Sequence, residues 1–135
     1  MQHGLKIAQE FADLMDNNRY TEAALVMSPA CRYFFRGSVL EGVPNIIQSY
    51  VSNFESAKNQ LDEIQFFSEV VPEGVGVFRL KYLDRLRKGS DWFEHRCEQT
   101  ITIEESRVSE IRHFDLPGEP EKLNVWFSEK GIKRR

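Results

Sequence analysis

The sequence predicts an α+β fold in which helices come first and a strongly curved antiparallel sheet follows, enclosing a small pocket. Apolar residues recur at helical spacing up to about residue 58. From about residue 61 the pattern changes to long strand-like runs separated by short turns. The chain has 135 residues, which suits one domain with its own hydrophobic core, so we expect a single domain over 1–135.

Three helices are expected in the first part of the chain. Their predicted ranges are 5–16, 19–27 and 44–58. Ser28 and Pro29 should end the second helix, because proline disfavours the helical conformation in the residue before it. Pro44 suits the first position of the third helix, where no backbone N–H is needed. A fourth, terminal helix is expected over 121–129.

Five longer strands are expected around these helices. Their predicted ranges are 30–36, 61–71, 75–86, 91–103 and 108–116. The last four are connected by short segments with turn chemistry, at 72–74, 87–90 and 104–106. Gly37 and Gly42 bracket a turn or short hairpin. The second half therefore predicts an antiparallel meander.

Side-chain parity predicts which residues share a face of this sheet. With connections at 87–90 and 104–106, two rows of cross-strand neighbours follow: Tyr82–His95–Asp115 and Leu80–Cys97–His113. This face should be mostly apolar with a titratable cluster at one end, and the third helix should cover it. The opposite face should carry a charge ladder of Arg79, Glu98 and Arg112.

Composition excludes several classes of protein. The net charge of −3 offers no basic excess for phosphate, so no nucleic acid partner is expected. No apolar stretch approaches the roughly 20 residues that cross a bilayer, and the N-terminus lacks the features of a signal peptide. Cys31 and Cys97 stand alone, as reduced thiols do in cytoplasmic proteins. We therefore expect a soluble, cytoplasmic protein without membrane partners.

The order of elements resembles that of a known superfamily. Helix, helix, strand, helix and then four strands, with the stretch RGSVLEGVPNIIQSY over 36–50, resembles the nuclear transport factor 2-like superfamily over nearly the whole chain. That group includes ketosteroid isomerases, scytalone dehydratase and SnoaL-like polyketide cyclases. The resemblance implies a cone-shaped, cystatin-like fold with a pocket at its open end, and a homodimer that packs sheet against sheet.

The resemblance also directs attention to particular residues. Asp115 is similar in position to the acid/base aspartate of SnoaL-like cyclases, and His95, His113 and Tyr82 are similar in type to residues of scytalone dehydratase. These four are the predicted catalytic residues. The residues predicted to line the pocket are Phe78, Leu80, Phe93, Cys97, Ile111, Tyr50, Phe54, Phe11 and Met15. Residues 36–38 supply no carboxylate after the first strand, so steroid isomerisation is not expected.

The predicted function is acid/base catalysis on a small molecule. A carboxylate beside a histidine can move a proton alpha to a carbonyl, and Tyr82 can stabilise the oxygen that gains charge. The expected activity is a cofactor-free lyase, isomerase or cyclase acting on a carbonyl-containing or polycyclic apolar compound. No phosphate loop, nucleophile elbow or HExxH motif is present, and neither a metal nor a cofactor is expected.

Other interpretations of the same residues stay open. The two histidines and Asp115 can be satisfied structural groups, with Asp115 capping the turn at 116–118. They can also hold Zn²⁺ together with Cys97, or Cys97 can act as a nucleophile. At the level of function, the alternative is a non-catalytic module that binds a small apolar ligand, or a dimeric protein-interaction domain.

Overall fold

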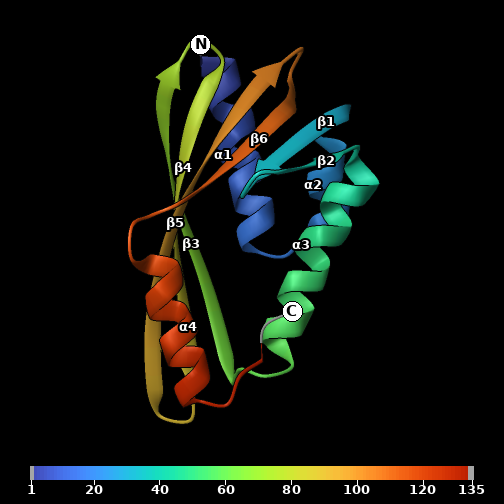
Figure 1. Cartoon of the computed structure of the whole chain (residues 1–135). Helices are drawn as coiled ribbons and strands as arrows, with labels where there is room; N and C mark the ends of the chain where they lie inside the picture. Colours follow the sequence, from blue (N-terminus) through green and yellow to red (C-terminus); the bar gives the residue numbers. More distant parts are fainter. Residues whose placement is uncertain (1, 134–135) are drawn as a thin grey trace.

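A computed structural model describes residues 2–133 (Figure 1). The helices are α1 (Gln2–Asp16), α2 (Tyr20–Leu25), α3 (Val43–Lys58) and α4 (Glu119–Glu129). The strands are β1 (Met27–Phe35), β2 (Ser38–Glu41), β3 (Glu63–Gly74), β4 (Val77–Lys88), β5 (Asp91–Glu104) and β6 (Arg107–Asp115). The predicted order of helices and long strands is therefore confirmed, and the short hairpin between Gly37 and Gly42 is the one made by β1 and β2.

The six strands form one sheet in the order β2-β1-β6-β5-β4-β3. Strands β3 to β6 pair antiparallel along the chain, as the meander pattern predicts, whereas β1 lies parallel to β6. The sheet twists strongly, with α1 against its upper half and α4 beside the lower half of β5 (Figure 1). The fold is α+β with a curved sheet, but the sheet is not antiparallel throughout.

The first strand begins earlier than the sequence predicts. The second helix ends at Leu25 and not at Ser28 and Pro29 as expected, and both of these residues lie inside β1, which starts at Met27. Met27 is 1 % exposed and pairs with Val108, and the register then shifts before Arg32. Proline is tolerated at such an irregularity because no ladder hydrogen bond is required of its nitrogen there.

The observed cross-strand rows differ from the predicted rows because the register of β5 is shifted by two residues relative to both β4 and β6. Gly89 and Ser90 alone form the turn between β4 and β5, with Gly89 at φ +63°, the left-handed conformation that a two-residue hairpin needs at its first position. Arg87 and Lys88 extend β4 instead of forming part of the loop. The observed rows are Tyr82–Cys97–Asp115, Leu80–Gln99–His113 and Asp84–His95.

The predicted assignment of side chains to the two faces of the sheet is nevertheless confirmed. The register shift is two residues, and side chains along a strand alternate between faces with a period of two. Tyr82 and Asp115 still share a row, and so do Leu80 and His113. The predicted row that joined His95 to Tyr82 and Asp115 is wrong. His95 lies opposite Asp84 instead.

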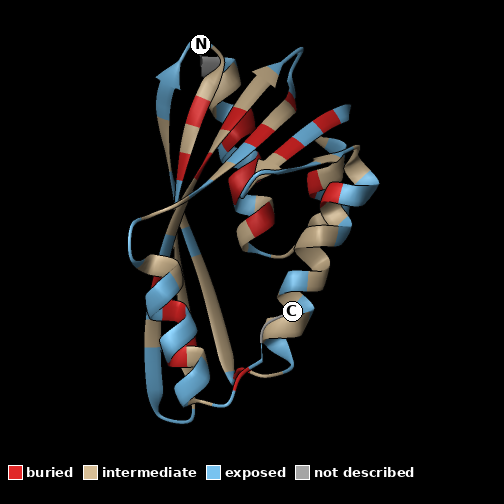
Figure 2. Ribbon diagram, viewed as in Figure 1, coloured by how far each residue is buried: buried red, intermediate tan, exposed pale blue. Residues whose placement is uncertain are grey.

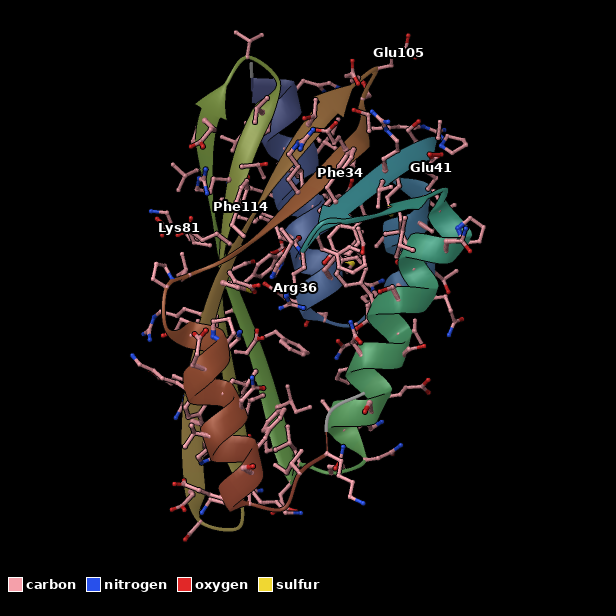
Figure 3. The ribbon with its side chains drawn as sticks, in the orientation of Figure 1. Phe34, Arg36, Glu41, Lys81, Glu105 and Phe114 are labelled. Atoms are coloured by element: carbon pink, nitrogen blue, oxygen red, sulfur yellow. The ribbon has the colours of Figure 1, made fainter. Side chains whose placement is uncertain are left out.

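The charge ladder on the other face is confirmed only in part. Arg79 pairs with Glu98 at 2.9 Å, as a diagonal rather than a direct neighbour. Arg112 pairs with Glu110 on its own strand and lies over the ring of Phe34. We call this surface the outer face; Phe34 and Phe114 mark it in Figure 3.

Two hydrophobic cores lie at opposite ends of the molecule (Figure 2). The larger packs α1 and α3 against the upper sheet, with Phe11, Ile46 and Leu80 fully buried. The smaller joins α4 to the lower sheet, through Leu61, Leu86, Leu123, Trp126 and Ile132. Among the described residues, no helix combines the length and apolar character that a membrane span requires.

Candidate functional site

A cavity of about 390 Å³ lies between the two cores. Every helix and several strands contribute to its wall, which combines aromatic rings with a small set of polar side chains. The polar or titratable residues of the wall include Asp16, Tyr33, Arg36, Tyr50, Tyr82, Asp84, His95, Gln99 and His113. This combination of an apolar wall and a few convergent polar groups is typical of small-molecule sites.

The upper end of the cavity is organised around Gln99, which is 4 % exposed. Its side-chain oxygen accepts hydrogen bonds from the hydroxyls of Tyr50 at 3.3 Å and Tyr82 at 3.4 Å. Its amide nitrogen donates to the Tyr33 hydroxyl at 3.5 Å and lies 3.4 Å from His113 Nδ1. We call these five residues the Gln99 network.

Burial keeps the tyrosines of this network protonated. It raises the pKa of Tyr33 to about 12 and holds the pKa values of Tyr50 and Tyr82 well above 10. The rings of Tyr33 and Tyr50 are stacked, with centroids 5.5 Å apart, which fixes their orientation. Two of the hydroxyls thus converge on a single carbonyl-type oxygen, and both remain hydrogen-bond donors at any physiological pH.

Asp115 supports the network from behind His113. Its carboxylate accepts two hydrogen bonds from Arg36, at 2.7 and 2.8 Å, and lies 2.9 Å from His113 Nε2. The Arg36 guanidinium, followed by the bond from His113, lowers the pKa of Asp115 to about 2. Because an ionised carboxylate only accepts, the Nε2 atom of His113 carries a proton and Nδ1 is left to accept from Gln99.

Arg36 occupies an unusual backbone position to make this bond. It lies near the middle of the molecule where β1 ends (Figure 3), in the turn before β2, with φ +45°. Gly37 follows at φ +80°, so the hairpin turn is left-handed at both positions. This turn directs the guanidinium to Asp115 at the end of β6 rather than along the β1–β2 pair.

A second carboxyl, Asp84, lies elsewhere on the wall in a contrasting environment. Its side chain is partly buried, and it lines the cavity. Within residues 2–133, no hydrogen bond or ion pair joins its side chain to another residue. Burial, and secondarily the charge of Asp16, raises its pKa to about 7.

Asp16 extends the acidic region from the last turn of α1. Its carboxylate accepts a hydrogen bond from Ser68 at 2.5 Å. Burial raises its pKa despite that bond, and Asp13 adds to the effect. His95 lies opposite Asp84 on β5, with Nδ1 3.9 Å from Glu119 of α4. The lower region of the cavity therefore holds two carboxyls that burial disfavours in their charged form.

The structure brings together most of the predicted site. His95, His113 and Tyr82 line the cavity, as do Cys97, Tyr50, Phe54 and Met15. Asp115 is not part of the wall and contacts it through His113. Five residues predicted to line the pocket pack in the cores instead: Phe11, Phe78, Leu80 and Ile111 in the larger one, and Phe93 against Trp126 in the smaller one. Their side chains fill space between elements and leave none for a ligand.

Two other interpretations find little support in the geometry. Burial raises the pKa of the Cys97 thiol to about 12, with Asp84 and Asp115 adding to the effect, so the thiolate required for nucleophilic attack is disfavoured. Across residues 2–133, no group of three His, Cys, Asp or Glu side chains is arranged to hold a metal ion.

The sequence did not indicate Asp84 or Gln99 as site residues, nor the contact between Arg36 and Asp115. The parity argument already placed residue 84 on the same face as Tyr82, so its direction was available from the pattern. Gln99 belongs to that face as well, but the two-residue error in the predicted register hid its position between Leu80 and His113. The bond from Arg36 to Asp115 spans 79 positions and depends on the parallel pairing of β1 with β6, which no local pattern indicates.

Comparison with known proteins identifies the fold. The chain matches no family model and no curated protein sequence. It is similar in structure to Bal32a from a soil-derived mobile gene cassette, with TM-score 0.73, 9 % identity and 98 % of each chain covered. It is also similar to a putative SnoaL-like polyketide cyclase from Shewanella putrefaciens CN-32, with TM-score 0.72, 11 % identity, and 96 % of this chain and 88 % of that one covered.

A third similar structure is a Mycobacterium tuberculosis protein in complex with estradiol-17β-hemisuccinate. Its TM-score is 0.65 at 10 % identity, covering 87 % of this chain and 96 % of that one. A further similar chain, from an Exiguobacterium species, is described as a nuclear transport factor 2-like protein of unknown function. The chain thus has the nuclear transport factor 2-like fold, and the fold predicted from the sequence is confirmed.

Proposed function

We propose that this chain is a small-molecule enzyme that transfers protons to and from a carbonyl compound bound in the cavity. One observation carries the proposal: Asp115 holds His113 in a single tautomer in the Gln99 network, which also presents the hydroxyls of Tyr50 and Tyr82. A fixed imidazole provides the acid/base group, and paired hydroxyls provide donors for an oxygen that gains negative charge. The reaction class is a cofactor-free isomerisation, cyclisation or elimination.

The chemical step follows from the hydrogen-bond directions. His113 Nδ1 removes a proton from the carbon alpha to the substrate carbonyl, and the carbonyl oxygen becomes an enolate oxygen. The Tyr50 and Tyr82 hydroxyls turn from Gln99 to that oxygen and donate to it. Asp115, kept ionised by Arg36, stabilises the imidazolium. The proton then returns to another atom of the substrate, which restores the neutral imidazole.

The dimensions and lining of the cavity limit the ligand. About 390 Å³ and walls formed by Tyr33, Phe54 and Phe66 suit a compact cyclic or aromatic compound. The Mycobacterium tuberculosis protein of the same fold was crystallised with estradiol-17β-hemisuccinate, a polycyclic compound with carbonyl groups. This supports the ligand class. The alternative, binding without turnover, is favoured by no separate feature and is an outcome of the test.

The test is proton exchange in D₂O, followed by NMR on a panel of small cyclic ketones. The native chain should accelerate loss of the alpha-proton signal for at least one compound. His113→Gln should reduce the exchange rate by at least about 100-fold, since general base catalysis contributes about 10²–10⁴. His3→Gln is the matched control, because His3 contacts Ser106 far from the cavity. Binding without exchange by the native chain would reject catalysis and leave a binding module.

We further propose that two copies pair through the outer face in the cytoplasm. This face exposes Phe67, Phe114 and Trp92, and Arg79 and Arg85 lie over the rings of Phe114 and Trp92, respectively. Aromatic residues and arginine are enriched in protein interfaces. Light scattering should give twice the chain mass, and Phe114→Glu should halve it. The free thiols of Cys31 and Cys97 suit a reducing compartment.

A further inference from the structure

The region around Asp84 remains unexplained by the proton-transfer step. Its carboxyl faces the cavity from β4 without a partner among residues 2–133, although buried charged groups are ordinarily paired. A second carboxyl, Asp16, lies on the same wall. Retaining two acidic groups in a partly buried site costs stability, and a cation that binds between them would offset that cost.

Aromatic rings surround the same region. Phe66 is the direct β3 neighbour of Asp84, so the two side chains share the inner face. The ring of Phe54 lies 5.9 Å from Phe66 and 6.4 Å from Tyr20, centroid to centroid. All three rings line the cavity, and they come from β3, α3 and α2. Several aromatic faces beside a carboxylate are the arrangement that recognises organic ammonium groups.

The charged and titratable groups near Asp84 determine whether the site favours a positively or a negatively charged ligand. Asp16 faces it from α1, His95 and Cys97 from β5, and Tyr82 from its own strand. Arg36 and Lys133 also line the cavity, but Arg36 is held by Asp115 and Lys133 lies in the segment after α4. His95 is directed toward Glu119 at 3.9 Å. Lys58 Nζ lies 5.9 Å from the centroid of the Phe54 ring, but Lys58 is exposed and does not line the cavity. The cavity wall around Asp84 is thus acidic and aromatic.

We propose that the cavity binds a ligand with an organic ammonium group, held by Asp84 and Asp16 within the ring set of Tyr20, Phe54 and Phe66. The inference deepens the proposed function, because it places the cationic group of the substrate at one end of the cavity and the reacting carbonyl at the Gln99 network. The substrate class becomes an amino-substituted cyclic carbonyl compound. The ammonium end orients the molecule, and His113 meets the carbon alpha to the carbonyl.

The site should show a characteristic pH dependence. Because the pKa of Asp84 is raised to about 7, only a few per cent of the carboxyl is ionised at pH 5.5 and most of it is ionised at pH 8. A ligand with a permanent positive charge needs the ionised form, and its apparent affinity follows that fraction. Affinity should therefore rise by about 30-fold between these two pH values.

The experiment uses benzyltrimethylammonium, which cannot titrate, and its neutral carbon isostere neopentylbenzene. Binding to the full chain is measured by NMR titration at pH 5.5 and pH 8. The cation should bind about 30-fold more tightly at pH 8, whereas the affinity for the neutral compound should not change. Asp84→Asn should remove the pH dependence and weaken cation binding at pH 8 at least about tenfold. The exposed Glu10→Gln on α1 is the matched control and should change neither.

A second variant keeps the test decisive should Asp84→Asn fail to fold. Phe66→Leu should weaken binding of the cation more than binding of the neutral isostere, because the ring face of phenylalanine attracts a cation and the side chain of leucine does not. Equal affinity for the two probes at pH 8, or cation binding unchanged in Asp84→Asn, would overturn the inference. Ketone exchange that depends on Asp84 without cation binding would make Asp84 the proton acceptor instead. Cation binding without exchange of any ketone would reject the proposed function and leave the ammonium site.

Discussion

Asp115 and Asp84 are two aspartates on the same face of one sheet, and their surroundings give them opposite properties. Asp115 is held by Arg36 and His113, which lower its pKa to about 2. Asp84 has no such partner among the described residues, and burial raises its pKa to about 7. The difference shows that burial without a partner keeps one carboxyl protonated up to neutral pH, whereas a bound guanidinium keeps the other ionised. Asp115 serves as a fixed charge and Asp84 as a variable one.

The largest expected effect concerns the stability contributed by Asp84. Its folded pKa of about 7 lies above the ordinary 3.8, so the unfolded chain releases the proton first as pH rises. Stability should therefore fall between about pH 4 and pH 7 and level off above. The gap between the two pKa values corresponds to about 4 kcal/mol. Urea unfolding at pH 4 and pH 8 should show the advantage of Asp84→Asn over the native chain growing by about that amount.

The contrast between Asp84 and Asp115 is contradicted if the stability advantage of Asp84→Asn over the native chain is the same at pH 4 and pH 8. Other groups titrate in this range, but they are common to the two chains and cancel in the difference. Glu10→Gln, which removes an exposed carboxyl on α1, should show a change close to zero. A comparable pH dependence for that control would attribute the effect to net charge instead.

The second effect has the opposite sign and concerns Asp115. Its folded pKa of about 2 lies below 3.8, so its stabilisation is present above about pH 4 and lost as pH falls through 2. Asp115→Asn should lower the free energy of unfolding at pH 7 by about 2 kcal/mol and have little effect near pH 2. In a double-mutant cycle with Arg36→Gln, the coupling energy between the two residues should account for most of this loss of stability, because the ion pair is bidentate. Independent, additive effects would contradict the assigned role of Arg36.

The smallest effect concerns the influence of Asp16 on Asp84. Burial is the larger cause of the raised pKa of Asp84, and the charge of Asp16 is the smaller one. Asp16→Asn should therefore lower the pH at which Asp84 titrates by less than about one pH unit. NMR of the Asp84 carboxyl carbon measures this directly. A rise in the pH at which Asp84 titrates would show that Asp16 is protonated near neutrality and donates a hydrogen bond to Asp84.

The sequence predicts the fold and the inner face well because both depend on periodicity. Helical spacing located α1 and α3, and strand alternation assigned Tyr82, His95 and His113 to one side of the sheet. The register depends on how many residues each turn uses. The prediction gave residues 87–90 to a loop, whereas Gly89 and Ser90 suffice.

The properties of the site could be predicted only in part. A carboxylate–histidine contact was expected and exists, but it joins Asp115 to His113 rather than to His95. The raised pKa of Asp84 depends on the helices that bury it. The lowered pKa of Asp115 depends on Arg36, which lies in the turn between β1 and β2. Both require long-range packing that parity does not encode. The catalytic roles of Asp115, His95, His113 and Tyr82 stay predictions.

The most direct test of the account is a pH titration of the native chain with ¹³C-labelled aspartate carboxyls. The Asp84 resonance should titrate near pH 7 and that of Asp115 near pH 2, assigned by Asp84→Asn and Asp115→Asn. A separation of about five pH units would establish that the cavity wall holds a variable carboxyl, Asp84, and that Asp115, behind His113, is a fixed charge. Titration of both near pH 4 would contradict the account, because neither burial nor Arg36 would then control the charge of the site.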